Sequence, residues 1–443
     1  MKLNSSSEPW LVYPLLLPFR TAYQNLSLDP LITPEEIARF AVEYDTNTIA
    51  ELQQEIEDSP RDECKVVFTG HRGCGKSTLL AKLKRVLEEE LFVVFFSISD
   101  LVEMSDVNHV NILFSIAMQL MGAADEQNID LKDSTKKQIT RWFAEEVLTE
   151  SDELKAEISS GFNFPTVFAW FKGQLGTSAT VRKDIKLRFE KNISELVQII
   201  NQLATVIEEA TDKEVVVIID DIDKLDMATV REIFYTHVKA LFLPSLRLVM
   251  TVPIAALREG DIFATLQTET NNKVIPMAVL KLISKSAKRQ TALQPKPELV
   301  ELFRELLFKR VDSSLVAPEA VAEIVFYSGG VLRELVRITG KCCQLCLLKV
   351  RQQQENTEIK IDSSVVQEAI QELRLDFELP LGAKDFEILQ KVYADFIPAD
   401  PKEQKFLDLL HSLHVLEYRN AEIWYDLHPI IVEILRRKEL IPT

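Results

Sequence analysis

Segments with an apolar centre occur at five places in the first two thirds of the chain, and each has the length of one β-strand. They lie at 65–69, 92–98, 214–220, 247–252 and, in a shorter form, 273–280. Strands that are apolar on both faces are typical of parallel sheets covered by helices. Between 193 and 211 the apolar positions are three and four residues apart, which predicts a helix packed on that sheet. The pattern predicts a doubly wound α/β core over residues 46–285.

The remainder of the chain is predicted to be mainly helical. Helices are expected over 34–43, after a capping Thr33 and a proline in the first turn, and over 47–57. Residues 1–30 are predicted to be an extended arm, lying on their own domain or on a neighbouring subunit. A helical pattern fills 297–375. Residues 384–443 combine short helices, a hairpin over 417–427 that turns at Arg419-Asn420, and a closing helix, an order typical of a winged-helix domain.

The predicted organisation therefore has four parts: an N-terminal arm and helix (1–45), the α/β core (46–285), a helical lid (286–378) and a winged-helix domain (379–443). The core carries a long insertion at 128–192, with an amphipathic helix expected around 134–147. Its aromatic stretch at 161–171 is followed by four basic residues, Arg182, Lys183, Lys186 and Arg188. Aromatic and basic residues together suit single-stranded nucleic acid or a membrane surface. The alternative is that they pack the insertion onto the core or onto another subunit.

The strongest chemical signal is the segment Gly70-His71-Arg72-Gly73-Cys74-Gly75-Lys76-Ser77, which matches Gly-x4-Gly-Lys-Ser/Thr in full. It follows a predicted buried strand and opens an amphipathic helix, the setting in which backbone N–H groups surround phosphates. Lys76 is expected to reach the β- and γ-phosphates and the Ser77 hydroxyl to bind Mg²⁺. The alternative is a structural glycine turn. The candidate nucleotide-binding residues are Gly70, Gly73, Cys74, Gly75, Lys76, Ser77 and Thr78.

Two acidic residues, Asp220 and Asp221, end the third apolar run, where ligands bind in parallel sheets. Asp220 is expected to hold Mg²⁺ through water, and Asp221 to orient or deprotonate the attacking water. Acids at this place can instead cap the next helix, which is the interpretation we give to Asp223 and Asp226. No Asn-Lys-x-Asp motif for guanine follows a later strand, so ATP is the expected nucleotide.

These motifs resemble those of AAA+ ATPases. The resemblance rests on the Walker A segment 70–77, the Walker B end at 219–225, a strand ending in Thr251 and the sequence Ser328-Gly329-Gly330-Val331-Leu332-Arg333. Within the AAA+ superfamily the chain is similar to the origin-recognition-like initiators and to the STAND signal-transduction NTPases, over roughly residues 33–443. The resemblance implies that Thr251 is sensor 1 and Arg333 sensor 2, both reading the γ-phosphate. The alternatives are that Thr251 simply ends a strand and that Arg333 is a surface arginine beside Glu334, although the preceding Gly-Gly pair favours the sensor role for Arg333.

One position departs from the AAA+ pattern. An arginine finger is usual near the start of the fifth strand, where this chain has Asn271-Asn272-Lys273. Arg258 is the nearest candidate, and STAND proteins typically lack the finger. The departure favours slow hydrolysis without help from a neighbouring subunit.

Charge bears on the choice of partner. The 443-residue chain has 51 Lys+Arg and 68 Asp+Glu, a net charge of −17, which excludes a protein whose whole surface binds nucleic acid. Residues 376–443 have 8 Lys+Arg against 13 Asp+Glu, a net charge of −5, so the predicted winged helix is a poor DNA reader. A winged helix that contacts protein or regulates the lid is favoured.

Five cysteines in no regular framework indicate a reducing compartment, and we expect a cytoplasmic protein. Cys342, Cys343 and Cys346 lie in a leucine-rich stretch and are expected in the core, with metal binding as the alternative. The apolar run at 10–19 is broken by Pro14 and Pro18 and is unlike a signal peptide. No membrane span is predicted.

Three functions follow as hypotheses. The first is an ATP- and Mg²⁺-dependent switch whose ATP or ADP state controls assembly or the binding of a protein partner. The second is an initiator-like or transposition-regulator-like ATPase that loads on or remodels DNA. The third is a nucleotide-locked scaffold with negligible turnover.

Overall fold

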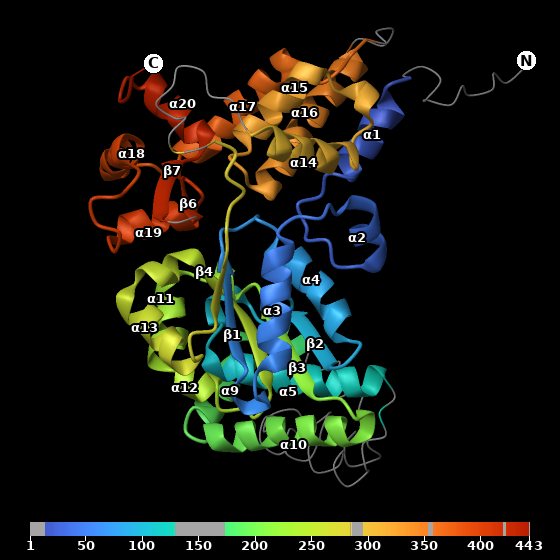
Figure 1. Ribbon diagram of the computed structural model, residues 1–443, viewed down its shortest axis with the longest axis vertical. Coiled ribbons are helices and arrows are strands. Elements are labelled where there is room, and N and C mark those ends of the chain that lie inside the picture. Colours follow the sequence, from blue (N-terminus) through green and yellow to red (C-terminus); the bar gives the residue numbers. More distant parts are fainter. Residues whose placement is uncertain are drawn as a thin grey trace, which may run out of the picture. The chain divides into compact units, whose positions relative to one another are not determined.

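The computed structural model describes residues 14–127, 129, 173–283, 285, 296–352, 358–419 and 422–442 (Figure 1). They form two compact units. The sheet unit consists of Asp45–Thr69 and Leu79–Pro276, and the P-loop unit consists of Met1–Tyr44, Gly70–Thr78 and Met277–Thr443. The glycine-rich segment thus packs with the two ends of the chain, whereas the sequence predicts it within the core domain.

The sheet has five strands in the order β2-β3-β4-β1-β5, which confirms the predicted α/β class. Their bounds are β1 (Lys65–Gly70), β2 (Phe92–Ser97), β3 (Val215–Asp220), β4 (Arg247–Pro253) and β5 (Val274–Met277). β3 pairs in parallel with β2 on one side and β4 on the other. Every residue of β3 and β4 is buried, as expected of strands covered on both faces.

Helices surround the sheet, and two of them, α5 and α10, pack against each other (Figure 1). α10 buries the apolar face that the sequence predicts, including Leu196, Ile200, Leu203 and Ile207. The helices of the sheet unit are α3 (Thr46–Asp58), α5 (His109–Glu126), α9 (Ala179–Phe189), α10 (Ile193–Thr211), α11 (Met227–Arg231), the π-helical turn Glu232–Thr236, α12 (Val238–Leu241) and α13 (Gly260–Glu269). α4 (Lys76–Leu87) begins in the glycine-rich segment. Short 3₁₀ turns lie at Arg61–Glu63, Ile98–Asp100, Met104–Asp106, Ile222–Lys224 and Ile254–Arg258.

In the P-loop unit a helical lid precedes a small domain that contains a hairpin. The lid consists of α14 (Pro297–Phe308), the 3₁₀ turn Ser313–Leu315, α15 (Pro318–Tyr327), α16 (Leu332–Gln352) and α17 (Ser363–Glu378), which pack on one another (Figure 1). Cys342, Cys343 and Cys346 are fully buried in α16, as expected of core residues.

Residues 383–437 form what we call the hairpin domain. It contains α18 (Ala383–Asp395), α19 (Gln404–His411), β6 (Val415–Arg419), β7 (Ile423–Leu427) and α20 (Pro429–Arg437). The strands pair antiparallel from Val415–Leu427 to Arg419–Ile423, around the predicted turn. The order of elements is the predicted one, and its assignment as a winged helix stays a prediction.

The N-terminal arm is not extended as predicted, because α1 (Leu16–Gln24) is a helix. Pro18 falls in its first turn, where a missing N–H group costs nothing, so the proline does not prevent the helix. α1 buries Phe19 and Ala22 and packs against α16. α2 (Pro34–Phe40) follows with the expected Thr33 cap, completed as a capping box by Glu36.

The insertion is described only from residue 173 onward, so the predicted helix at 134–147 and the aromatic stretch at 161–171 lie outside the described residues. Arg182 is 5% exposed and is bound by Asp106 at 2.7 Å and by the Leu175 carbonyl at 2.8 Å. Lys186 pairs with Glu232 at 3.4 Å. These two basic residues hold α9 in the fold. Because Arg182 is buried and paired, it does not contribute to an exposed nucleic-acid patch as predicted.

The glycine pair before α16 is a structural requirement. Gly330 has φ +87°, and a Cβ there would lie 1.8 Å from the Leu280 carbonyl oxygen, which belongs to the backbone and cannot move aside. We expect Gly330→Ala to lower the free energy of unfolding by about 3 kcal/mol or more, through the clash and the left-handed φ. Denaturant unfolding measures this change. Gly340→Ala is the control, because the nearest atom would be Leu26 Cβ at 3.8 Å and the helix favours alanine. Equal losses in the two variants would contradict the account.

Candidate functional site

The glycine-rich segment joins β1 to α4 and curls around a lysine. Gly73 and Gly75 have φ of +76° and +101°, and a Cβ on Gly75 would lie 1.7 Å from the Tyr44 hydroxyl. Only glycine suits this position. Lys76 is 4% exposed, and its Nζ donates to the carbonyls of Gly70 at 3.0 Å and His71 at 2.8 Å. The ammonium group is therefore held by the loop's own backbone.

The residues that flank Lys76 differ in what their side chains contact. Cys74 is buried, with Sγ 2.9 Å from the His71 carbonyl and 3.7 Å from Met277 Sδ, so its contribution to a phosphate is limited to its backbone N–H group. The Thr78 hydroxyl accepts from the Leu31 N–H group at 3.1 Å, which ties α4 to the N-terminal segment. Ser77 stands at the start of α4, half-buried, where the motif places its hydroxyl for Mg²⁺.

Three parts of the P-loop unit contact this loop from outside. The Arg333 N–H group, at the start of α16, donates to the Gly73 carbonyl at 3.0 Å. The Tyr44 hydroxyl donates to the Cys74 carbonyl at 3.2 Å. The Glu417 N–H group, in β6, donates to His71 Nε2 at 2.8 Å. Lid, N-terminal segment and hairpin domain therefore all hold the loop, through contacts that no local sequence pattern predicts.

His71 must be neutral to accept the hydrogen bond from Glu417. It is 1% exposed, and burial, together with the charges of Lys76 and Arg419, lowers its pKa to about 3. Unfolded histidine takes up a proton near pH 6.5, whereas folded His71 does not until about pH 3, so stability is lost as the pH falls through this window.

The expected loss from His71 approaches about 1.4 kcal/mol of unfolding free energy per pH unit below 6.5. Urea unfolding of wild type and His71→Gln at pH 7.5, 6.5 and 5.5 measures it. The glutamine oxygen can still accept from Glu417 but does not titrate, so the variant should show a shallower acid loss. Identical slopes would contradict the assignment.

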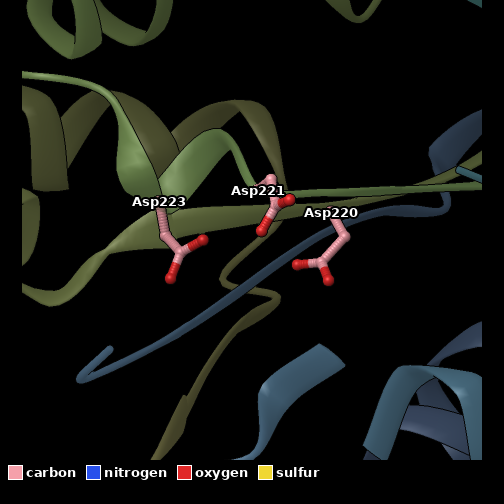
Figure 2. Close-up of side chains that lie close together, drawn as sticks. All are labelled: Asp220, Asp221 and Asp223. Atoms are coloured by element: carbon pink, nitrogen blue, oxygen red, sulfur yellow. The ribbon is translucent and has the colours of Figure 1, made fainter. Parts of the chain in front are cut away.

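Three carboxylates gather after β3. Ligand oxygens of Asp220, Asp221 and Asp223 lie within 4.8 Å of one another, and all three residues are buried. Figure 2 shows the side chains projecting to the same side of the chain. Asp226 caps α11 as predicted, accepting from the N–H groups of Ala228 and Thr229, and Asp223 belongs to this carboxylate cluster. The signal available in the sequence was the recurrence of aspartate at 221 and 223.

Asp221 is fixed by short contacts. Its Oδ2 accepts from the hydroxyls of Ser97 at 2.6 Å and Ser99 at 2.8 Å, and its Oδ1 pairs with Lys224 Nζ at 2.7 Å. Burial acts to raise the pKa of this carboxyl, but the bonds from Lys224, Ser97 and Ser99 outweigh it and leave the pKa lowered. A carboxylate with a lowered pKa is a weak base, so the geometry favours orienting water over deprotonating it.

Polar side chains also end the neighbouring strands. Asp220 ends β3 and is 3% exposed. Ile219 of β3 pairs with Met250 of β4, so the next residue of β4, Thr251, lies beside Asp220. The buried hydroxyls of Thr251 and of Thr69 in β1 have no hydrogen-bond partner among the described residues. Buried unsatisfied hydroxyls are costly and often belong to ligand sites. Thr69 is a candidate that the sequence analysis missed, although it directly precedes Gly70.

The donor set suits Mg²⁺. Carboxylate and hydroxyl oxygens are the ligands this ion prefers, and here they are buried and close together. Asp220, Asp221 and Thr251 belong to the sheet unit, while Lys76, Ser77 and Arg333 belong to the P-loop unit. The Arg333 side chain reaches the Leu28 carbonyl, with Nη2 3.4 Å from the oxygen.

Comparison with known proteins identifies the domain class. Residues 46–251 match the KAP family P-loop domain, so this part of the chain is similar to a P-loop NTPase that binds nucleotide. No curated protein matches the chain. Cdc6p from Pyrobaculum aerophilum is 11% identical, with TM-score 0.41, over 94% of this chain and 98% of that one. Orc1 from Aeropyrum pernix, solved in complex with DNA, is 11% identical, with TM-score 0.42, over 93% and 97%.

A Walker-type ATPase of Pyrococcus abyssi is 13% identical, with TM-score 0.41, over 93% of this chain and 99% of that one. The family match and the glycine-rich loop confirm the predicted resemblance to P-loop NTPases. Within the described part of the chain, every helix is too short or too polar to span a bilayer.

Proposed function

We propose that the chain is an ATP-dependent molecular switch, in which the nucleotide bound at the P-loop sets how the lid and the hairpin domain are held. The observation that carries the proposal is the set of contacts on the loop, where Arg333 binds the Gly73 carbonyl, Tyr44 binds the Cys74 carbonyl and Glu417 binds the His71 side chain. Any change in the loop on phosphate binding acts directly on those contacts. A ligand shifts a conformational equilibrium only through such differential contacts.

The proposed chemistry divides among the chain's own residues. Lys76 and the loop N–H groups bind the phosphates, and Ser77 and Asp220 hold Mg²⁺. Mg²⁺, when bound, supplies charge neutralisation and orientation of the γ-phosphate. Asp221, held by Ser97, Ser99 and Lys224, orients the attacking water. Thr251 and Arg333 are proposed to read the γ-phosphate.

Hydrolysis is proposed to be slow. The turn before β5, where an arginine finger is usual, holds Asn271 and Asn272 in left-handed conformations with φ of 52° and 66°. Arg258, at the end of the 3₁₀ turn after β4, stays the candidate for a finger. A slow ATPase remains in one nucleotide state for longer, as a switch requires.

The DNA-loading alternative has weaker support from the hairpin domain. Lysines that would face phosphates are paired with acids: Lys384 with Glu403 at 2.5 Å and Lys405 with Asp385 at 3.6 Å. Breaking these ion pairs to free the lysines would reduce the free energy gained when the lysines bind the phosphate backbone of DNA. We therefore propose that the switch controls binding to a protein partner or to a second copy of the chain.

Light scattering after size-exclusion chromatography tests the choice, with ADP and with a non-hydrolysable ATP analogue, each with and without duplex DNA. The switch proposal expects the two nucleotides to give different sizes or elution positions without DNA. A difference that appears only with DNA would favour the loading ATPase. Purified protein that keeps unhydrolysed ATP for hours would favour the scaffold.

A further inference from the structure

A pocket of about 310 Å³ lies inside the P-loop unit, apart from the phosphate-binding backbone. Among the described residues of the glycine-rich segment, only Arg72 lines it; Lys76 and Ser77 do not. Its other walls come from α16, from the end of α17 and from the turn between α19 and β6. We call it the arginine pocket, and its lining residues are Leu28, Arg72, Arg333, Glu334, Arg337, Asp376, Phe377, His411, Ser412, Leu413 and His414.

Positive charge predominates in the arginine pocket. Three guanidinium groups, from Arg72, Arg333 and Arg337, meet two carboxylates there. Glu334 is 4% exposed, and its Oε2 accepts from Arg337 Nε at 3.0 Å and Nη2 at 2.7 Å, so this carboxylate is already matched. The second carboxylate, Asp376, and two further guanidinium groups, those of Arg72 and Arg333, complete the charged lining.

Arg337 and His414, which line the pocket, are held in place by neighbouring groups. The Arg337 guanidinium lies over the Phe377 ring, 5.0 Å from its centroid, which leaves Nη1 outside the pair with Glu334. His414 is 5% exposed and is fixed on both sides, with Nδ1 2.6 Å from Ser412 Oγ and Nε2 2.9 Å from the Phe377 carbonyl. Side chains fixed before binding lose little conformational entropy when a ligand arrives.

This chemistry selects a phosphate. Guanidinium forks match the geometry of phosphate oxygens and bind them with charge-assisted hydrogen bonds. A volume of about 310 Å³ exceeds one phosphate group and lies at the lower end of pockets for small organic ligands. We propose that the arginine pocket is a second anion site that binds a small organic phosphate; its lining leaves out Lys76 and Ser77 and shares Arg333 with the residues proposed to read the γ-phosphate.

The position of the pocket gives its occupant a regulatory consequence. Its walls come from the P-loop through Arg72, from the lid through Arg333 and Arg337, and from the hairpin domain through residues 411–414. An anion bound to all three stabilises the arrangement in which the hairpin domain holds the loop. The occupant and the P-loop nucleotide are then thermodynamically coupled.

Equilibrium dialysis with labelled inorganic pyrophosphate tests the proposal by stoichiometry. Wild type should bind two pyrophosphates, one at the P-loop and one in the arginine pocket, and Lys76→Ala should retain one. The double variant Glu334→Gln/Arg337→Gln should also bind one; changing both residues avoids leaving the Glu334 carboxylate buried without its partner. Arg72→Gln, which does not touch the Glu334–Arg337 pair, should weaken the second site at least about tenfold. Arg436→Gln, at an exposed position of α20, is the matched control and should bind two.

One pyrophosphate bound by wild type and none by Lys76→Ala would overturn the proposal, since the P-loop would then be the only anion site. Two bound by the Glu334→Gln/Arg337→Gln variant would overturn it equally. If Lys76→Ala behaves as wild type while the double variant loses one site, the arginine pocket stands and the P-loop assignment fails.

Discussion

Lys76→Ala is expected to weaken ATP binding at least about 100-fold, which corresponds to about 3 kcal/mol of lost charge-assisted hydrogen bonding. The ammonium group is buried and already sits on the loop, 3.0 Å from the Gly70 carbonyl and 2.8 Å from the His71 carbonyl, so it binds a phosphate without reorganisation. Titration with a fluorescent ATP analogue measures the change.

Lys65→Ala is the matched control, because Lys65 is a second buried lysine at the other end of β1. Its Nζ donates to the carbonyls of Asp62 at 3.0 Å and Leu246 at 2.7 Å, and burial lowers its pKa to about 8. This variant should lose stability and keep its ATP affinity. Equal ATP affinity in Lys76→Ala and wild type would contradict the P-loop assignment.

Asp221→Asn is expected to bind ATP normally and to lower turnover by about 100-fold or more, the size typical of a lost water-orienting or proton-transfer group. An amide cannot accept hydrogen bonds at both of its terminal atoms, so the contacts with Ser97, Ser99 and Lys224 cannot all persist. Phosphate release under multiple-turnover conditions measures the effect, with ATP binding checked separately.

Asp226→Asn makes the same chemical change five residues away. Asp226 caps α11, and asparagine is an equally good cap, so turnover and stability should both be retained. If Asp221→Asn hydrolyses ATP as fast as wild type does, Asp221 has no catalytic role.

The elements that the sequence predicted well are those set by local chemistry. The glycine-rich segment, the capping box at Thr33 and the apolar strands β1 to β4 each depend on residues that are close in sequence. α5 escaped prediction because it is apolar on nearly every side and so shows no helical alternation. α1 escaped because residues 1–30 were predicted to be extended, whereas Pro18 falls in the first turn of a helix that begins at Leu16.

The candidate site was predicted only in part, for a related reason. The motifs identified Lys76, Ser77, Asp220 and Asp221, but not the residues that act on them from a distance. His71 and Glu417 are hydrogen-bonded across 346 positions of sequence. Such a contact depends on how the hairpin domain packs on the loop, which hydrophobic periodicity does not encode. The same holds for the arginine pocket, whose walls come from five separate segments.

Hydrogen exchange at the Glu417 amide tests the central claim most directly, because that N–H group is the donor to His71 in the loop. The switch account predicts faster exchange over residues 415–419 with a non-hydrolysable ATP analogue than without nucleotide, since phosphate binding competes for Lys76 and shifts the backbone of His71. Lys76→Ala should abolish the difference. Identical exchange with no nucleotide, with ADP and with the analogue, in protein shown to bind ATP, would contradict the account.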